Sequence, residues 1–148
     1  MIKETKNNRG FVILFAITLS SILLAIALGV ANITLEELKF GTSAQNTNNA
    51  FFAADTGTEY ALFNDKPSVN NYPSPATDGA QQTWFVIISG LGGAGASCAV
   101  VSITKTNVLN SPDITTTIIS KGYNAGGSAP GSCNPPPNSV EREIKTNY

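Results

Sequence analysis

The 148-residue sequence contains no histidine, and it has only two cysteines, one methionine and one tryptophan. Without histidine, neither a Ser-His-Asp or Cys-His catalytic arrangement nor an imidazole metal ligand can form. The carboxylates offer no substitute. Asp55 and Glu59 lie one helical turn apart on what we expect to be a solvated helix face, and Asp113 is typical of a turn. We therefore expect no enzyme, no metal site and no cofactor.

Charged residues make up only 13% of the chain, and their signs are unevenly distributed. Three basic residues and one acidic residue precede Gly10, a net charge of +2, whereas six basic and nine acidic residues follow it, a net charge of −3. Basic residues beside a membrane span stay on the cytoplasmic side, so we expect the C-terminal part to be exported. An acidic exported domain lacks the excess of basic residues that binds a phosphate backbone. We therefore expect no nucleic-acid partner.

One long stretch has no charge at all, from Phe11 to Ile33. As a helix that rises about 1.5 Å per residue it is roughly 33 Å long, enough to cross a hydrocarbon core of about 30 Å. Its hydroxyl residues, including Thr18 and Ser21, can donate to carbonyl oxygens one turn earlier. The stretch therefore predicts a single transmembrane helix in contact with membrane lipid.

A cleaved secretory signal peptide is the alternative interpretation of this segment. Small residues at 25–27 and 29–31 are suited to signal peptidase. However, the apolar run is longer than the ~7–15 residues of a signal core. Residues 35–39 also continue as good helix formers beyond Asn32. We therefore favour a retained anchor.

The helix is expected to continue over residues 34–64, because no proline occurs before Pro67 and apolar residues recur at helical spacing. Residues 41–49 are poor helix formers, which predicts a kink or local unwinding. One apolar stripe follows, and we expect the sheet to cover its large side chains, above all Phe51, Phe52 and Leu62. The stripe and its neighbours are Phe51, Phe52, Ala54, Thr58, Ala61, Leu62 and Phe63.

The remainder is typical of a loop followed by a small sheet. Residues 65–82 are rich in proline, asparagine and aspartate. Within 83–148, strands are predicted at 83–89, 98–104, 114–120 and 139–146. Short connections favour an antiparallel meander, with the continuously apolar first strand central and the alternating last strand near an edge. The expected fold class is α+β, a long N-terminal helix packed on a four-stranded antiparallel sheet.

Two local motifs remain. Gly90 to Gly95 match G-x-G-x-x-G, but a dinucleotide site needs a helix after the glycines, and the residues that follow predict a strand. We therefore expect a hairpin loop there. Cys98 and Cys133 allow one pairing, and an exported domain favours a disulfide over two separate thiols.

Arg9-Gly10-Phe11, followed at once by an apolar helix, resembles the class III leader of type IV pilins and pseudopilins. The resemblance implies that residues 1–10 are a leader, which a prepilin peptidase removes between Gly10 and Phe11 before Phe11 is N-methylated. The layout of the whole chain also looks pilin-like, with residues 11–33 as the assembly helix. The stretch from Ala50 to Phe63 is similar to the helix of PilX-type minor pilins.

One residue departs from the family pattern. Major pilins carry a glutamate at the fifth mature position, where this chain has Phe15. In the family that carboxylate pairs with the positively charged N-terminal amine of a neighbouring subunit. A buried charge without such a partner is costly. We therefore favour a minor pilin, used in initiating or tipping a pilus, over the major subunit.

The resemblance also implies partners and a location. The partners are other pilin subunits and, before assembly, membrane lipid. The subunits are expected to pack through the N-terminal helix at Phe15 and at the small residues Ala25, Ala27 and Gly29, which permit close approach. The subunit is expected to start in the cytoplasmic membrane with its C-terminal domain exported. After assembly it would lie in the pilus at the extracellular surface. A type II secretion pseudopilin and a membrane-tethered exported binding domain remain the alternatives.

Overall fold

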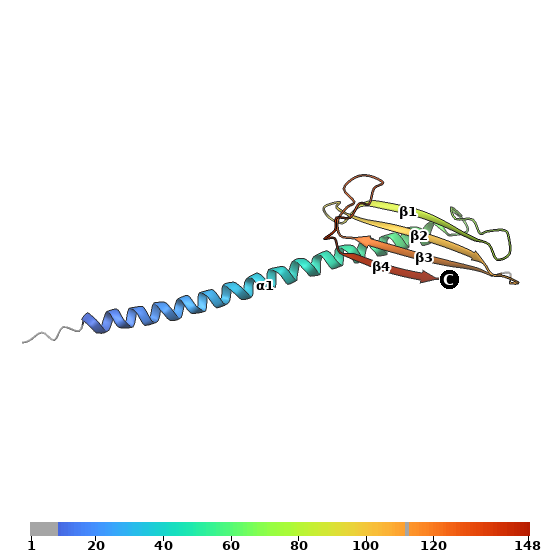
Figure 1. Cartoon of the computed structure of the whole chain (residues 1–148). Coiled ribbons are helices and arrows are strands. Elements are labelled where there is room, and N and C mark those ends of the chain that lie inside the picture. The colour runs from blue at the N-terminus through green and yellow to red at the C-terminus, as the bar shows by residue number, and fades with distance from the viewer. Residues whose placement is uncertain (1–8, 112) are drawn as a thin grey trace, which may run out of the picture. The chain divides into compact units, whose positions relative to one another are not determined.

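The computed structural model describes residues 9–111 and 113–148, and the sequence before Arg9 lies outside them. The chain divides between Thr42 and Ser43 into two compact units. Helix α1 (Arg9–Asn64) supplies the whole described part of the first unit and the beginning of the second. The second unit adds a four-stranded sheet, so the α+β class is confirmed (Figure 1).

Helix α1 forms without interruption, although its sequence changes character along its length. In the apolar part, the hydroxyl of Thr18 donates to the Phe15 carbonyl at 2.9 Å and that of Ser21 to the Thr18 carbonyl at 2.8 Å, as predicted. Residues 41–49 are also helical, so the unwinding expected there is wrong. Each poor helix former costs at most about 1 kcal/mol. The flanking turns are already helical, so the helix extends through residues 41–49 without a second nucleation cost.

The four strands form a meander in which every neighbouring pair is antiparallel. Their order is that of the chain, and they are β1 (Gln81–Leu91), β2 (Ser97–Asn107), β3 (Ile114–Tyr123) and β4 (Glu141–Asn147). The last strand lies at an edge, as predicted. The first was expected to be central and is instead the other edge, because the first strand of a meander has a partner on one side only.

The second half of the helix lies on the sheet through its smallest side chains. Ala50, Ala54 and Ala61 are fully buried, and a Cβ atom added at Gly122 of β3 would overlap the Ala50 carbonyl and the Ala54 amide. Such close approach leaves no room for large side chains. Phe51, Phe52 and Phe63 are accordingly exposed by 47%, 62% and 58%, so the expectation that the sheet covers Phe51 and Phe52 is wrong.

The core of the second unit lies between this helix and the inner face of the sheet. Val101 and Ile103 of β2 and Ile118 of β3 are fully buried, and they alternate with more exposed neighbours, as strand geometry requires. Trp84 of edge strand β1 packs against Tyr72, with ring centroids 5.7 Å apart. The loop before β1 therefore closes one end of the core.

The Cys98–Cys133 disulfide is present, with the Cα atoms 5.6 Å apart. It joins the first residues of β2 to the long connection between β3 and β4. The sequence motif at Gly90 to Gly95 lies in the β1–β2 hairpin, and strand β2 follows it. Gly90, Gly92 and Gly95 have positive φ angles, which glycine adopts without strain, so the glycines serve the turn.

Removing the disulfide is expected to lower the free energy of unfolding by about 3–4 kcal/mol, because the bridge closes a loop with a sequence separation of 35. Chemical denaturation of the full chain in detergent, comparing the wild type with a variant carrying Cys98→Ser and Cys133→Ser, measures the loss. A control carrying Ser128→Ala, an exposed position in the same connection, should unfold like the wild type. Equal midpoints for all three proteins would contradict this expectation.

Candidate functional site

The first unit is an apolar helix with no covering. Every described side chain from Phe11 to Thr42 is exposed, and the large apolar ones are exposed on all sides, from Phe11 (76%) to Phe40 (79%). In the described residues this is the one helix long and apolar enough to cross a membrane, judged by length and composition. Core helices of soluble proteins pass the same test but bury that surface, and here none of it is buried. The helix is therefore that of a membrane span or a signal.

The predicted packing residues fall on different faces of this helix. Ala25 and Gly29 are four residues apart and share a face, whereas Ala27 lies on the other side. Space around Gly29 is open, with no atom within 4 Å of the position of a Cβ. Ser21 extends the face of Ala25 and Gly29 by one further turn, and its hydroxyl is already satisfied by the Thr18 carbonyl. The predicted packing set did not include Ser21, although serine is also a small residue that permits close helix approach.

Phe15 and Phe11 lie near the start of the described helix. Phe15 is 58% exposed, and its carbonyl accepts the Thr18 hydroxyl. Gly10 is helical, and the sequence before Arg9 is outside the described residues. Cleavage at Gly10 and Phe11 and methylation of Phe11 therefore stay predictions.

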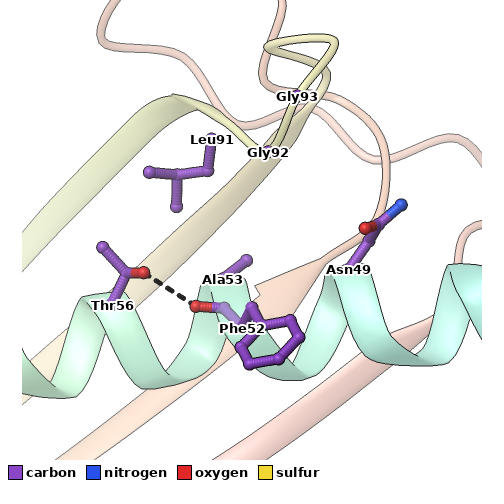
Figure 2. Close-up of a pocket in the computed structure, with 7 residues that line it drawn as sticks. All are labelled: Asn49, Phe52, Ala53, Thr56, Leu91, Gly92 and Gly93. Carbon is purple, nitrogen blue, oxygen red and sulfur yellow. Dashed lines mark hydrogen bonds between the residues drawn. The ribbon is translucent and has the colours of Figure 1, made fainter.

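The second unit presents a hollow of about 290 Å³ between the helix and the β1–β2 hairpin. Figure 2 shows the helix on one side, with Asn49, Phe52, Ala53 and Thr56, and Leu91, Gly92 and Gly93 on the other. The Thr56 hydroxyl donates to the Phe52 carbonyl at 2.8 Å. The lining has no charged side chain, so the hollow suits apolar groups and neutral hydrogen-bonding groups.

The charged residues gather elsewhere, at β4 and at the end of the helix. Lys121 contacts Glu141 at 3.0 Å and Glu143 at 3.7 Å on the outer face of the sheet. Hydrogen bonds from Tyr123 and Lys121 hold the pKa of the Glu141 carboxyl below its usual range. These residues form a solvated edge, and the described residues contain no group of three or more His, Cys, Asp or Glu side chains placed to hold a metal ion.

No protein-family model, curated protein or solved structure matches this chain. The architecture is pilin-like by shape: a long apolar N-terminal helix that, further along, packs on a four-stranded antiparallel sheet. The disulfide indicates that the second unit is extracytoplasmic, since such bridges persist in oxidising compartments.

Proposed function

We propose that this chain is a structural subunit of a type IV pilin-like assembly, of the minor kind that initiates or tips the filament. The observation that carries the proposal is the uncovered apolar segment of residues 11–33, which belongs to the same helix α1 that lies on the sheet. A surface that is apolar on every side is stable only in lipid or against other apolar helices. Assembly from membrane into filament supplies both environments in turn.

The side chains of the helix fit such a transfer. Ala25 and Gly29 let a neighbouring helix approach closely, and the hydroxyls of Thr18 and Ser21 are hydrogen-bonded within the helix, which lowers their cost in lipid. Phe15 adds no charge, so this subunit brings no carboxylate for a neighbour's N-terminal amine. That absence favours a subunit incorporated rarely over one repeated throughout the filament.

Mass spectrometry of the mature N-terminus tests the proposal. We expect a chain that begins at N-methylated Phe11, and a Gly10→Val variant that keeps its leader because the residue before the cut has changed. A chain that begins at Asn32 would indicate secretion by signal peptidase, and an unprocessed wild-type N-terminus would indicate a tethered domain. Either result would overturn the proposal.

Quantification in purified filaments separates the two kinds of subunit. A minor subunit should be scarce there, while deletion of its gene reduces piliation. If it formed the dominant filament band, it would be the major subunit. A loss of protein secretion with intact piliation would instead assign it to a secretion machine.

A further inference from the structure

The fold brings one lysine and one aspartate together in a place that is closed to water. Asp65 directly follows the last residue of helix α1, where its N–H donates to the Ala61 carbonyl at 3.0 Å. Lys105 lies on β2, on the same inner face as the fully buried Ile103. The Asp65 and Lys105 side chains are 4% and 8% exposed, and the Lys105 Nζ lies 2.6 Å from Asp65 Oδ1. The helix end and the strand therefore hold an amino group and a carboxyl group in contact.

This contact is close, but it is not a hydrogen bond. Within the described residues, Asp65 Oδ1 is a buried oxygen without a hydrogen-bond partner, although the lysine nitrogen is so near. The nitrogen is therefore not aligned as a donor to this oxygen. Because a carbon–oxygen bond adds only about 1.2 Å, Nζ lies at most roughly 3.8 Å from the carboxyl carbon Cγ. Reacting atoms that are about to form a bond lie at a similar separation, about 3–3.5 Å.

The second carboxylate oxygen has a donor of its own. The Tyr148 hydroxyl donates to Asp65 Oδ2 at 2.6 Å. Burial, and after it this bond to Asp65, raise the Tyr148 pKa well above its usual value, so the hydroxyl keeps its proton. A donor fixed at Oδ2 stabilises the negative charge that develops on this oxygen when a nucleophile adds to Cγ. The lysine nitrogen and the hydroxyl donor therefore contact different oxygens of one carboxyl group.

We propose that Lys105 and Asp65 condense after folding, so that an amide bond joins their side chains. The Lys105 ammonium first transfers a proton to Oδ1, and burial favours the resulting neutral amine and carboxylic acid over two charges. The lone pair of Nζ then forms a bond to Cγ while the Tyr148 hydroxyl holds Oδ2. A second proton moves from Nζ to the Oδ1 hydroxyl, the Cγ–Oδ1 bond breaks, and one water molecule leaves. The reaction needs no oxidant, reductant or further reactant.

The ion pair seen in the structure is the state of freshly folded protein, and the amide forms from it slowly. Stability comparisons at these two residues refer to the freshly folded state. Once formed, the amide ties the end of helix α1 covalently to strand β2, and its burial protects it from hydrolysis by water. The inference depends on the second unit alone and stands apart from the pilin proposal.

The exposed ion pairs of the described residues provide an internal control. Lys121 lies 3.0 Å from Glu141 and 3.7 Å from Glu143, but these three side chains are exposed by 44%, 42% and 46%. Water solvates both charges there, so proton transfer to a neutral pair is unfavourable. We therefore expect condensation at Lys105 and none at Lys121.

Mass spectrometry of the full chain, purified in detergent and incubated after folding, tests the proposal. After denaturation in acid, which separates ion pairs, we expect a form lighter by one water molecule whose fraction grows with time. A tryptic digest should place the missing water at residues 65 and 105, and trypsin should not cleave after Lys105, because it requires a free lysine side chain. A wild-type chain that never loses water, or that loses it only elsewhere, would overturn the proposal.

Lys105→Arg is the matched variant for the nucleophile. It keeps a positive charge beside Asp65, but a guanidinium stays protonated and cannot attack the carboxyl carbon, so no water should be lost. Equal loss of water in this variant would point to another reaction, such as a cyclic imide at Asp78-Gly79, and would overturn the proposal. The digest of the wild type remains decisive if the arginine does not fit the buried site.

Tyr148→Phe tests the donor at Oδ2. Without this hydroxyl, the loss of water should be slower by at least about tenfold. Tyr123→Phe is the control: Tyr123 donates to Glu141 at the other end of β3, and its replacement should leave the rate unchanged. A Tyr148→Phe variant that condenses as fast as the wild type would refute the reaction as written.

Discussion

Substitution of Gly122 by valine should separate the helix from the sheet and lower the free energy of unfolding by more than about 3 kcal/mol. The cause is steric: even the Cβ atom would overlap the Ala50 carbonyl and the Ala54 amide, which belong to helix backbone and cannot rotate away. Gly122→Ala carries the same Cβ and should already be clearly destabilising. Urea denaturation of the full chain in detergent, followed by tryptophan fluorescence of Trp84, measures the change.

Gly93 provides the matched control for this prediction. It lies in the β1–β2 hairpin with no atom within 4 Å of a built Cβ and without a positive φ angle. Gly93→Val should therefore shift the unfolding free energy by no more than about 0.5 kcal/mol. Equal stability of the Gly122 and Gly93 variants would show that the helix does not approach β3 as closely as described.

The second large effect is expected at the buried ion pair of Asp65 and Lys105. The Lys105 ammonium lies 2.6 Å from the Asp65 carboxylate, and the two side chains are only 8% and 4% exposed. The Tyr148 hydroxyl donates to the other carboxylate oxygen at 2.6 Å, and burial, followed by this bond to Asp65, raises the Tyr148 pKa well above its usual value. Asp65→Ala would leave the ammonium buried without its partner and should cost about 3–5 kcal/mol.

The same site offers a control that separates an unpaired charge from the worth of the pair. A double variant, Asp65→Leu with Lys105→Met, removes both charges and keeps most of the volume, so it should lie within about 1–2 kcal/mol of the wild type. Tyr148 is 53% exposed, and its hydroxyl can turn to water in that variant. A double variant as unstable as Asp65→Ala would refute the argument from the buried charge.

The sequence predicted some features of the candidate site and missed others. Composition alone indicated the anchor, because an uncharged run from Phe11 to Ile33 suits lipid whatever surrounds it. The predicted packing set treated Ala25, Ala27 and Gly29 together, and helical geometry separates Ala27 from the other two. The exposed edge at Phe85 and Ile87 was not anticipated, since a continuously apolar strand is most often buried on both faces.

The sequence by itself determined the helix, the four strands, the hairpin at Gly90 to Gly95 and the single disulfide. These depend on local properties: the period of apolar residues, the positions of proline and glycine, and the presence of two cysteines in an exported chain. Only the tertiary structure decided which face of the helix meets the sheet and which strand is left at the edge. Both depend on distances between segments far apart in the chain. Gly57 and Gly122 let the backbones approach closely, and that approach buries the alanines and leaves Phe51 and Phe52 exposed.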